Sequence, residues 1–582
     1  VGPSVAERIV KRFGTKTLDI ITTQSARLRE VKGVGNARAQ AIATAVRTRR
    51  QEAESLAYLH GLNIGPALAR KIYTRYKDHT AQAIESDPYK VAEEISGVGF
   101  RTADRIGLAA GFAHDDIRRV KSAVRYVLFR ASEEGHTYLS YNELAHALAG
   151  YAVSDTALAS ALSQLDERGE IRIEDQAIFL SALFAAECYV AQHLSQLAQP
   201  RTPPEEACAA EDKSQATLET LSPLQRQAAA SSLRSGLLVL TGGPGTGKTT
   251  AVSAILHVHR AANHRVALCA PTGRAAKRLS EATGHPASTI HRLLEWNPST
   301  ASFSRNARMP LDADLVLIDE ASMLDLPLCQ HLLAAISDTA SVVFVGDVNQ
   351  LPPIGPGHVL RAILDSQVGT VIRLSQVFRQ AEKSAIVRAA HALLQGKLTH
   401  EAPATPTGDG DLFVLRTKDS TRSIEKLLYM VERIRQVYKL DSVHDVQVLS
   451  AMRKGQAGID ALNEILQTKL NPSTAGSPPN TLRLGDKVMQ LRNDYDRDVY
   501  NGDLGRVASI QDGNIVIDFD GRNVAYGTKD LDALTLAYAC TIHKAQGSEF
   551  PAVIIILDTG HHVLLNRSLL YTAMTRARKL AV

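Results

Sequence analysis

Short apolar runs alternate with helical stretches over the second half of the chain. Six of these runs have the length of buried strands, namely 237–240, 266–270, 315–318, 342–345, 446–449 and 553–557. Apolar strands that alternate with helices are typical of parallel α/β sheets. Six such runs over this length predict an α/β fold with two domains.

Two insertions interrupt the alternation. β-rich pieces carry turn signals at Asn501-Gly502, Asp512-Gly513 and Asp520-Gly521, and predict a small all-β insertion of about 50 residues. A shorter insertion at 296–308 predicts a hairpin, because the segment Asn-Pro-Ser at 297–299 forces a turn.

The beginning of the chain repeats one short pattern four times. Each copy has a turn glycine, at Gly2, Gly35, Gly65 and Gly99, followed by alanine four residues on and isoleucine seven residues on. In the third copy Asn63 stands where the second and fourth copies have a first glycine, and asparagine also tolerates a positive φ. A tight turn that opens a helix leaves backbone N–H groups free to bind a phosphate.

These repeats resemble the helix-hairpin-helix motif of DNA-binding proteins, which grips the DNA backbone without reading sequence. The alternative is a set of plain helical hairpins that use glycine for close packing. The first 130 residues hold 23 Lys and Arg against 13 Asp and Glu, whereas the whole chain has a net charge of only +5. A basic first module favours nucleic acid as a partner, with a merely solvated basic surface as the other interpretation.

Between the repeats and the α/β part, the pattern changes twice. Helical stretches at 140–148 and 155–168 lead to two short alternating runs at 171–175 and 178–180, an order typical of a winged-helix module. Such modules bind DNA or serve only in packing, and both roles stay open. The Pro-, Glu- and Ala-rich stretch that follows, near 199–221, is typical of a linker.

Composition excludes several classes of protein. No apolar run approaches the ~18–20 residues that span a bilayer, and the first residues lack a signal pattern. The five cysteines are scattered without a C-x-x-C pair, which argues against a disulfide framework and against a cysteine-ligated metal. We therefore expect a reducing, cytoplasmic compartment. The chain does not begin with Met, so we also expect that it is a piece of a longer protein.

The segment GGPGTGKT at 242–249 satisfies the G-x-x-x-x-G-K-T pattern between a predicted strand and a predicted helix. Its glycines free backbone N–H groups to cradle phosphates, Lys248 neutralises the β- and γ-phosphate oxygens, and the Thr249 hydroxyl reaches Mg²⁺. The loop residues expected to bind the nucleotide are Gly243, Pro244, Gly245, Thr246, Gly247, Lys248, Thr249 and Thr250.

Carboxylates follow the strand at 315–318. Asp319 is placed to hold Mg²⁺, and Glu320 is placed to activate the attacking water as a general base. After the next strand, Gln350 can hydrogen-bond a γ-phosphate or the lytic water. A guanine-reading Asn-Lys-x-Asp segment is absent from the sequence, which disfavours a GTPase.

Further motifs follow in a fixed order. They are LSPLQ (221–225), APTGRAA (270–276), STIH (288–291), GDVNQLPP (346–353), LSQVFR (374–379), TIHKAQGSE (541–549) and YTAMTRA (571–577). In this order and spacing they resemble superfamily 1 DNA helicases, and within these the superfamily 1B group of RecD-like enzymes. The N-terminal repeats are similar to those of the RecD-like helicases that act without RecB and RecC.

The resemblance implies a nucleotide and its contacts. Gln225 would read the adenine, which makes ATP the nucleotide. Arg379 and Arg576 would be arginine fingers from the second RecA-like domain, a role worth ~10³–10⁵ in rate elsewhere. Gly547 and Glu549 would line the nucleotide from the side opposite the first domain, and Gln350 would sense the γ-phosphate.

The resemblance also implies contacts with single-stranded DNA. These would come from small or polar residues that touch the backbone, so sequence preference should be slight. A capping threonine or a core histidine is the alternative for each. The hairpin at 296–308 corresponds to a strand-separating wedge, where Phe303 or Trp296 would stack on a base or anchor the hairpin. The candidates are Pro271, Thr272, Thr289, His291, Phe303, Thr541 and His543.

The expected fold is thus α/β, with two RecA-like P-loop domains that carry a β-hairpin insertion and an SH3-like insertion. An all-α helix-hairpin-helix region and a winged-helix-like module precede them. The predicted limits are 1–113 for the repeats, 114–198 for the winged-helix-like module, 199–220 for the linker, 221–370 for the first RecA-like domain with its hairpin at 295–309, 371–480 and 531–582 for the second, and 481–530 for the SH3-like insertion.

The predicted function is an ATP- and Mg²⁺-dependent 5′→3′ DNA helicase in repair or recombination. We expect a monomer in the bacterial cytoplasm, associated with the nucleoid, that acts on single-stranded and on tailed or forked duplex DNA. A single-stranded-DNA-binding protein is a candidate partner, and a membrane is not. Two alternatives remain: a DNA-stimulated translocase with little unwinding, and a helix-hairpin-helix DNA-structure-binding module with a nucleotide switch.

Overall fold

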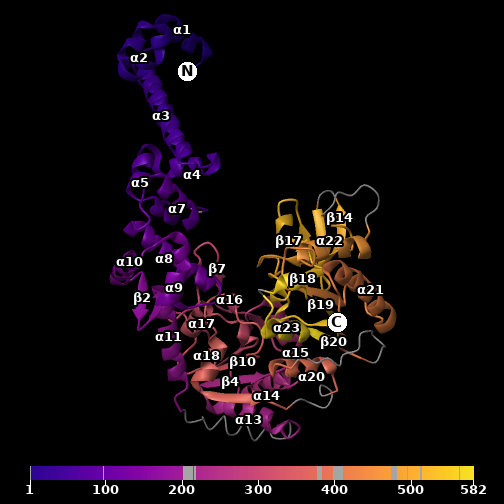
Figure 1. Ribbon diagram of the computed structural model, residues 1–582. Coiled ribbons are helices and arrows are strands. Elements are labelled where there is room, and N and C mark those ends of the chain that lie inside the picture. The colour runs from indigo at the N-terminus through magenta and orange to yellow at the C-terminus, as the bar shows by residue number, and fades with distance from the viewer. Residues whose placement is uncertain are drawn as a thin grey trace. The chain divides into compact units, whose positions relative to one another are not determined.

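The computed structural model describes residues 2–95, 97–200, 214, 218–376, 383–397, 410–472, 481–494, 496–511, 514–562 and 564–582 (Figure 1). The chain divides into two compact units, Val1–Phe184 and Ala185–Val582. Most of the predicted linker at 199–220 lies outside the described residues. No helix in the described part of the chain is long and apolar enough to cross a membrane.

The first part of unit 1 consists of helices. These are α1 (Pro3–Phe13), α2 (Thr17–Thr23), α3 (Asn36–Gly61), α4 (Pro66–Tyr76), α5 (Thr80–Ser86), α6 (Pro88–Glu94) and α7 (Phe100–Ala109). The turn glycines of the four repeats are the N-cap residues of α1, α3, α4 and α7, all in an extended conformation. Gly33, Asn63 and Gly97 occupy the preceding turn position with φ of +93°, +57° and +91°. The predicted all-α repeat region is therefore confirmed.

The repeats pack in pairs around two separate cores. Ile9, Leu28 and Ile42 belong to one core, and Leu59, Ile72 and Ile106 belong to the other. Helix α3 contributes to both and, with 26 residues, is about 39 Å long at ~1.5 Å per residue (Figure 1).

The winged-helix-like module completes unit 1. It comprises α8 (Ile117–Glu133), α9 (Tyr141–Leu148), α10 (Asp155–Glu167) and a sheet with the order β1-β3-β2, formed by Tyr138–Ser140, Ala177–Leu180 and Ile171–Glu174. The predicted helices and hairpin are present, and β1 was not predicted. Buried Arg119 on α8 binds Asp104 on α7 through two nitrogens, at 2.7 and 3.0 Å, which fixes the module to the last repeat.

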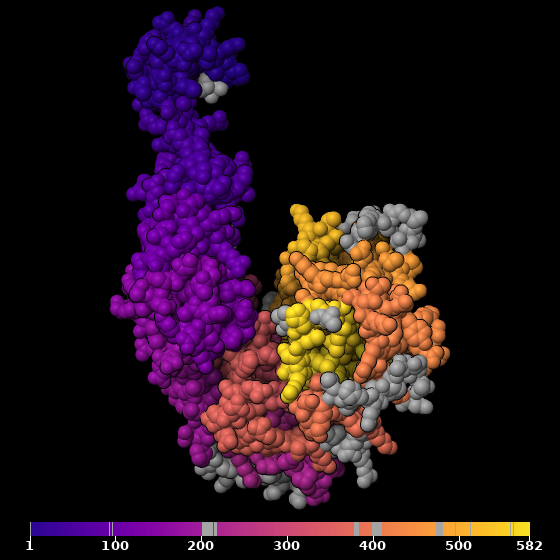
Figure 2. Space-filling model, in the orientation of Figure 1, coloured from indigo at the N-terminus to yellow at the C-terminus, as the bar shows by residue number. Residues whose placement is uncertain are grey.

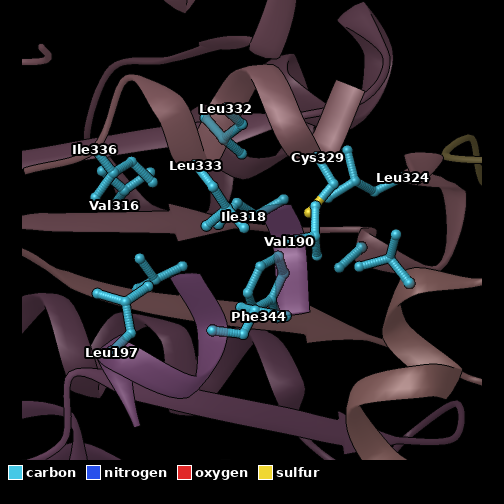
Figure 3. Close-up of a cluster of buried hydrophobic side chains, with 14 of the residues drawn as sticks. Val190, Leu197, Val316, Ile318, Leu324, Cys329, Leu332, Leu333, Ile336 and Phe344 are labelled. Carbon is cyan, nitrogen blue, oxygen red and sulfur yellow. The ribbon is translucent and has the colours of Figure 1, made fainter. Parts of the chain in front are cut away.

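The first RecA-like domain has a six-stranded parallel sheet. Its order is β11-β4-β10-β9-β5-β6, formed by Thr370–Leu374, Leu237–Gly242, Ser341–Gly346, Leu315–Ile318, Val266–Ala270 and Ala287–Thr289. Helices α11 (Ser181–Leu197), α17 (Leu326–Ala334) and α18 (Val359–Ser366) share one core with the sheet (Figure 3). Helices α13 (Pro223–Arg234), α14 (Lys248–Ala261) and α15 (Gly273–Thr283) pack through other apolar clusters.

The second RecA-like domain has a parallel sheet of order β18-β12-β19-β20, formed by Ala539–Thr541, Val446–Ser450, Phe550–Ile556 and Ala577–Ala581. Its helices are α20 (Ala385–Leu394), α21 (Ser420–Tyr438), α22 (Ile459–Leu470) and α23 (Arg567–Met574). Figure 2 shows part of the last residues, in yellow, at the surface among the orange residues of the same domain. All six predicted strands are present, and they divide between the two sheets.

The SH3-like insertion is an antiparallel sheet of order β16-β15-β14-β13-β17, formed by Arg522–Tyr526, Asn514–Phe519, Leu504–Gln511, Lys487–Gln490 and Leu534–Leu536. It has its own apolar core. Asp520 and Gly521, with φ of +52° and +90°, form the predicted turn between β15 and β16. Asp512-Gly513 lies outside the described residues. The short hairpin β7 (Trp296–Asn297) and β8 (Ser302–Phe303) is also present in the first RecA-like domain.

Candidate nucleotide and DNA sites

The P-loop joins β4 to α14. Gly245 and Gly247 have φ of +72° and +79°, a backbone conformation that favours glycine. The Lys248 ammonium donates to the carbonyl oxygens of Gly242 and Gly243 at 2.6 and 3.0 Å, so it lies inside the curve of the loop. Thr246 is buried, whereas Thr249 and Thr250, in the first turn of α14, are exposed.

Asp319 and Glu320 follow β9. In the sheet, β10 lies between β9 and β4, the strand that leads into the P-loop. Burial and the charge of Glu320 raise the pKa of Asp319, against the opposing effect of Lys248. Glu320 itself has φ of +51°, which is uncommon for a residue with a side chain. Carboxylate and hydroxyl oxygens are ligands that suit Mg²⁺, so Asp319 and Thr249 fit such an ion.

The segment that follows β10 connects the two RecA-like domains through Asp347 and Leu351. Tyr571 on α23 donates a 2.5 Å hydrogen bond from its hydroxyl to Asp347 Oδ2. The backbone N–H of Leu351 donates to Thr572 Oγ1, and Gln546 donates to the Leu351 carbonyl. Between Asp347 and Leu351, Gln350 is only 8% exposed, and its Oε1 has no hydrogen-bond partner within the described structure.

Of the remaining candidate nucleotide-binding residues, Gln225 lies next to the P-loop, whereas Arg576 donates hydrogen bonds within its own domain. Gln225 is buried at α13 and donates to the carbonyl of Gly247 at 3.1 Å, next to the P-loop. Arg576 is buried and donates to Thr572 O, Ser548 O and Thr575 Oγ1, all within the second domain. Arg379 lies outside the described residues.

Gly547 and Glu549 face the first domain. A Cβ on Gly547 would lie 2.8 Å from Thr272 Oγ1, and Glu549 pairs with Arg278 on α15 at 2.6 Å. Burial disfavours the charge of Glu549, but Arg278, Arg578 and Arg576 outweigh it and lower the pKa of this carboxyl group. These contacts hold the two domains together beside α15.

The threonines proposed to touch DNA all lie at strand ends. Thr272 caps α15, Thr289 caps α16 (Ile290–Leu293), and the Thr541 hydroxyl accepts from the N–H of Lys544. Pro271 precedes Thr272 directly after β5, and His543 begins a short 3₁₀ helix after β18. The capping role that the sequence left open is therefore present. Thr289 ends β6, and Pro271 and Thr272 directly follow the adjacent strand β5.

Aromatic rings gather at the base of the β7–β8 hairpin. Trp296 and Phe303 face each other with ring centroids 4.7 Å apart, and Phe303 lies 4.9 Å from His331 on α17. The His291 ring is 5.6 Å from Phe303, and burial lowers its pKa. Burial also lowers the pKa of His543. The hairpin is thus anchored by the rings that the sequence offered as base-stacking candidates.

The SH3-like insertion contacts the first RecA-like domain, which sequence reasoning did not foresee. Asp498 accepts from Arg292 on α16, and Lys277 on α15 pairs with Asp520 at 2.6 Å. A Cβ on Gly273 would lie only 2.7 Å from the Tyr500 side chain. These pairs join residues more than 200 positions apart, so local patterns carry no signal for them.

Comparison with known proteins assigns these parts. "SAM-like Helix-hairpin-helix tandem" matches residues 1–48, and "ATP-dependent RecD2 DNA helicase HHH domain" matches 48–138. "AAA domain" matches 220–407, "ATP-dependent RecD-like DNA helicase SH3 domain" matches 462–519, and "UvrD-like helicase C-terminal domain" matches 536–582.

Relatives match over long stretches. The RecBCD enzyme subunit RecD of Mycolicibacterium smegmatis is 34% identical over 61% of this chain and 69% of its own. A solved structure of Pif1 helicase from Bacteroides with ADP-AlF3 and ssDNA is 20% identical, covers 66% of this chain and 92% of its own, and has a TM-score of 0.38. The ATP-dependent RecD2 DNA helicase of Deinococcus radiodurans is 34% identical over 99% of this chain and 81% of its own. With its repeats, P-loop and SH3-like insertion in the same chain, the protein belongs to the RecD2 family of ATP-dependent DNA helicases.

Proposed function

We propose that this helicase moves 5′→3′ along single-stranded DNA and unwinds tailed or forked duplex DNA. One observation carries the proposal: the P-loop faces the second RecA-like domain. A Cβ on Gly243 would lie 3.3 Å from the Tyr571 hydroxyl and 3.2 Å from His391 Cε1. A nucleotide on this loop would therefore touch both domains, so its hydrolysis can change how they fit together. The polarity rests on the resemblance to superfamily 1B enzymes.

The residues of the nucleotide site take the roles expected from their chemistry. Lys248 exchanges its two carbonyl partners for phosphate oxygens, and Glu320 takes the proton of the attacking water. Thr249 and Asp319 would hold Mg²⁺, which neutralises phosphate charge when bound. The other roles are adenine binding for Gln225, γ-phosphate sensing for Gln350, nucleotide lining for Gly547 and Glu549, and arginine fingers for Arg379 and Arg576.

Translocation follows from a change of affinity. ATP must bind the closed pair of domains better than the open pair, so that binding closes the cleft and hydrolysis reopens it. The proposed DNA contacts lie at strand ends or in the segments that directly follow them, with Pro271, Thr272, Thr289 and His291 on the first domain and Thr541 and His543 on the second. Alternating grip by these two groups moves the protein along the strand.

We propose a monomer in the bacterial cytoplasm, associated with the nucleoid, that serves DNA repair or recombination. A single-stranded-DNA-binding protein is the proposed partner, because such a protein covers the same strand that the motor occupies.

Two duplexes that differ only in a 5′ or a 3′ single-stranded tail test the proposal. With Mg²⁺ and ATP, the wild type should unwind the 5′-tailed duplex alone, and Lys248→Ala should unwind neither. Unwinding from the 3′ tail would contradict the proposed polarity. ATP hydrolysis that is slow and indifferent to DNA would favour a nucleotide switch instead of a motor.

A second candidate function is a DNA-stimulated translocase with little unwinding. It is favoured by the hairpin, whose strands are only two residues long and whose aromatic rings lie at its base. Replacing residues 297–302 by a Gly-Ser turn distinguishes the two. Under the helicase proposal, strand separation falls while DNA-stimulated ATP hydrolysis persists. Under the translocase proposal, neither rate changes.

A further inference from the structure

His391 on α20 lies against the P-loop but belongs to none of the motifs that the sequence indicated. A Cβ on Gly243 would lie 3.2 Å from His391 Cε1 and 3.7 Å from its Nε2. The ring of His391, from the second RecA-like domain, therefore lies in the space that a side chain at Gly243 would occupy.

The Nε2 atom of His391 is fully shielded from solvent and has no hydrogen-bond partner in the part of the chain that the structure describes. The packing of α20 does not explain this nitrogen, because the helix packs through aliphatic residues such as Ile386, Ala390 and Leu393. Its neighbour at the loop, Tyr571, is satisfied by Asp347. A buried polar atom without a partner is rare in folded proteins and calls for an explanation such as a missing ligand.

The position of Lys248 shows which end of a nucleotide His391 would meet. The lysine of a P-loop reaches the β- and γ-phosphates. Here its ammonium lies 3.0 Å from the carbonyl oxygen of Gly243, the residue beside which the His391 ring lies. At the opposite end of the loop, Gln225 binds the Gly247 carbonyl. His391 is therefore near the terminal phosphates.

A second buried polar atom without a partner lies at the same domain boundary. Gln350 Oε1 is unpaired, and the adjacent Leu351 is bonded to Thr572 of the second domain. The two atoms differ in chemistry, because the Gln350 oxygen is an acceptor whereas a histidine nitrogen can donate. Phosphate oxygens are acceptors, so a histidine N–H is a matching donor.

We propose that His391 donates a hydrogen bond from Nε2 to the terminal phosphate of ATP and thereby helps the closed domains distinguish ATP from ADP. This inference rests on the proposed function, since it uses the same nucleotide site. It makes His391 a nucleotide-contacting residue supplied by the second domain.

The test measures binding of a non-hydrolysable ATP analogue and of ADP to the full chain by fluorescence titration. His391→Leu should weaken the analogue about tenfold or more, as loss of a hydrogen bond to a charged group does, while ADP binding changes less than about twofold. His391→Gln places an amide nitrogen near Nε2 and should restore most of the analogue affinity. Gln395→Leu, at the exposed C-cap residue of α20 four positions further on, is the matched control and should change neither.

The thermal midpoint without nucleotide separates a ligand contact from a structural role. Because leucine removes an unpaired buried nitrogen, His391→Leu should not lower the thermal midpoint of the nucleotide-free protein. An equal loss of analogue and ADP affinity, or a lower midpoint with an unchanged affinity ratio, would overturn the inference. A wild type that binds neither nucleotide would instead overturn the proposed function, and this inference with it.

Discussion

Asp498 of the SH3-like insertion and Arg292 of the first RecA-like domain form a 2.7 Å ion pair across the two domains. The second oxygen of Asp498 accepts from Arg522 at 2.7 Å, so one carboxylate holds two arginines. Asp498 has φ of +53°, an uncommon conformation for a residue with a side chain. The ion pair therefore joins the insertion to α16, the helix that directly follows the proposed DNA contact Thr289.

Loss of the Asp498–Arg292 ion pair should affect DNA unwinding more than ATP hydrolysis. Asp498→Ala and Arg292→Ala should each slow unwinding of a forked duplex by up to about fivefold, because exposed pairs contribute ~0.2–1 kcal/mol. The double variant should be no slower than either single variant, and the effect should shrink in high salt. Additive losses in the double-mutant cycle would show that the two residues act separately.

Gly247 should be required for its backbone conformation. Gly247→Ala places a side chain at φ of +79°, at a cost of about 1–2 kcal/mol, and should weaken ATP binding about tenfold. Gly284→Ala is the matched control, since Gly284 has φ of +64° and open space around it at the end of α15. It should lower the thermal midpoint without changing ATP affinity. Equal ATP affinity in both variants would contradict this prediction.

Acid should destabilise the first RecA-like domain through His259. Burial, together with the nearby His264, lowers the pKa of His259 to about 3, and its ring bonds Ser232 and His264. The unfolded chain, with a histidine pKa of about 6.5, binds this proton more readily, so stability falls as the pH drops below about 6.5. The slope is about 1.4 kcal/mol per pH unit.

Urea unfolding at pH 7.5, 6.5 and 5.5 checks this prediction. His259→Gln removes the titrating group. Between pH 6.5 and 5.5 the free energy of unfolding of the wild type should therefore fall by roughly 1 kcal/mol more than that of the variant. The charge of Asp314 raises the pKa of His259, against the effect of burial, but Asp314 is present in both proteins. Parallel pH profiles would show that His259 does not titrate on unfolding.

The buried pair Arg119–Asp104 should stabilise the junction between the last repeat and the winged-helix-like module. Asp104→Ala removes the carboxylate that balances the charge of buried Arg119 and should cost about 3–5 kcal/mol. Faster hydrogen exchange in α7 and α8 of the full chain would report this loss. Glu133→Ala, which removes the exposed pair with Arg130, should cost less than about 1 kcal/mol. Similar exchange in both variants would contradict the prediction.

The sequence predicted most of the fold, because the signals for it are local. The strands that it missed, such as Ala287–Thr289 and Ala577–Ala581, are short and contain polar or charged residues. The P-loop, Asp319 and Glu320 were found because they follow predicted strands directly. Tyr571 and Asp347 are 224 positions apart, so their contact depends on how the domains fold together. The domain limits and the residue roles stay predictions.

Trp296 is the only tryptophan in the chain, and it lies in the hairpin against Phe303. All indole fluorescence of the protein therefore originates at this hairpin, with no competing signal from the rest of the chain. The native protein thus carries its own optical reporter. A change in its emission when a forked duplex binds would report the environment of the hairpin in real time, without any attached dye.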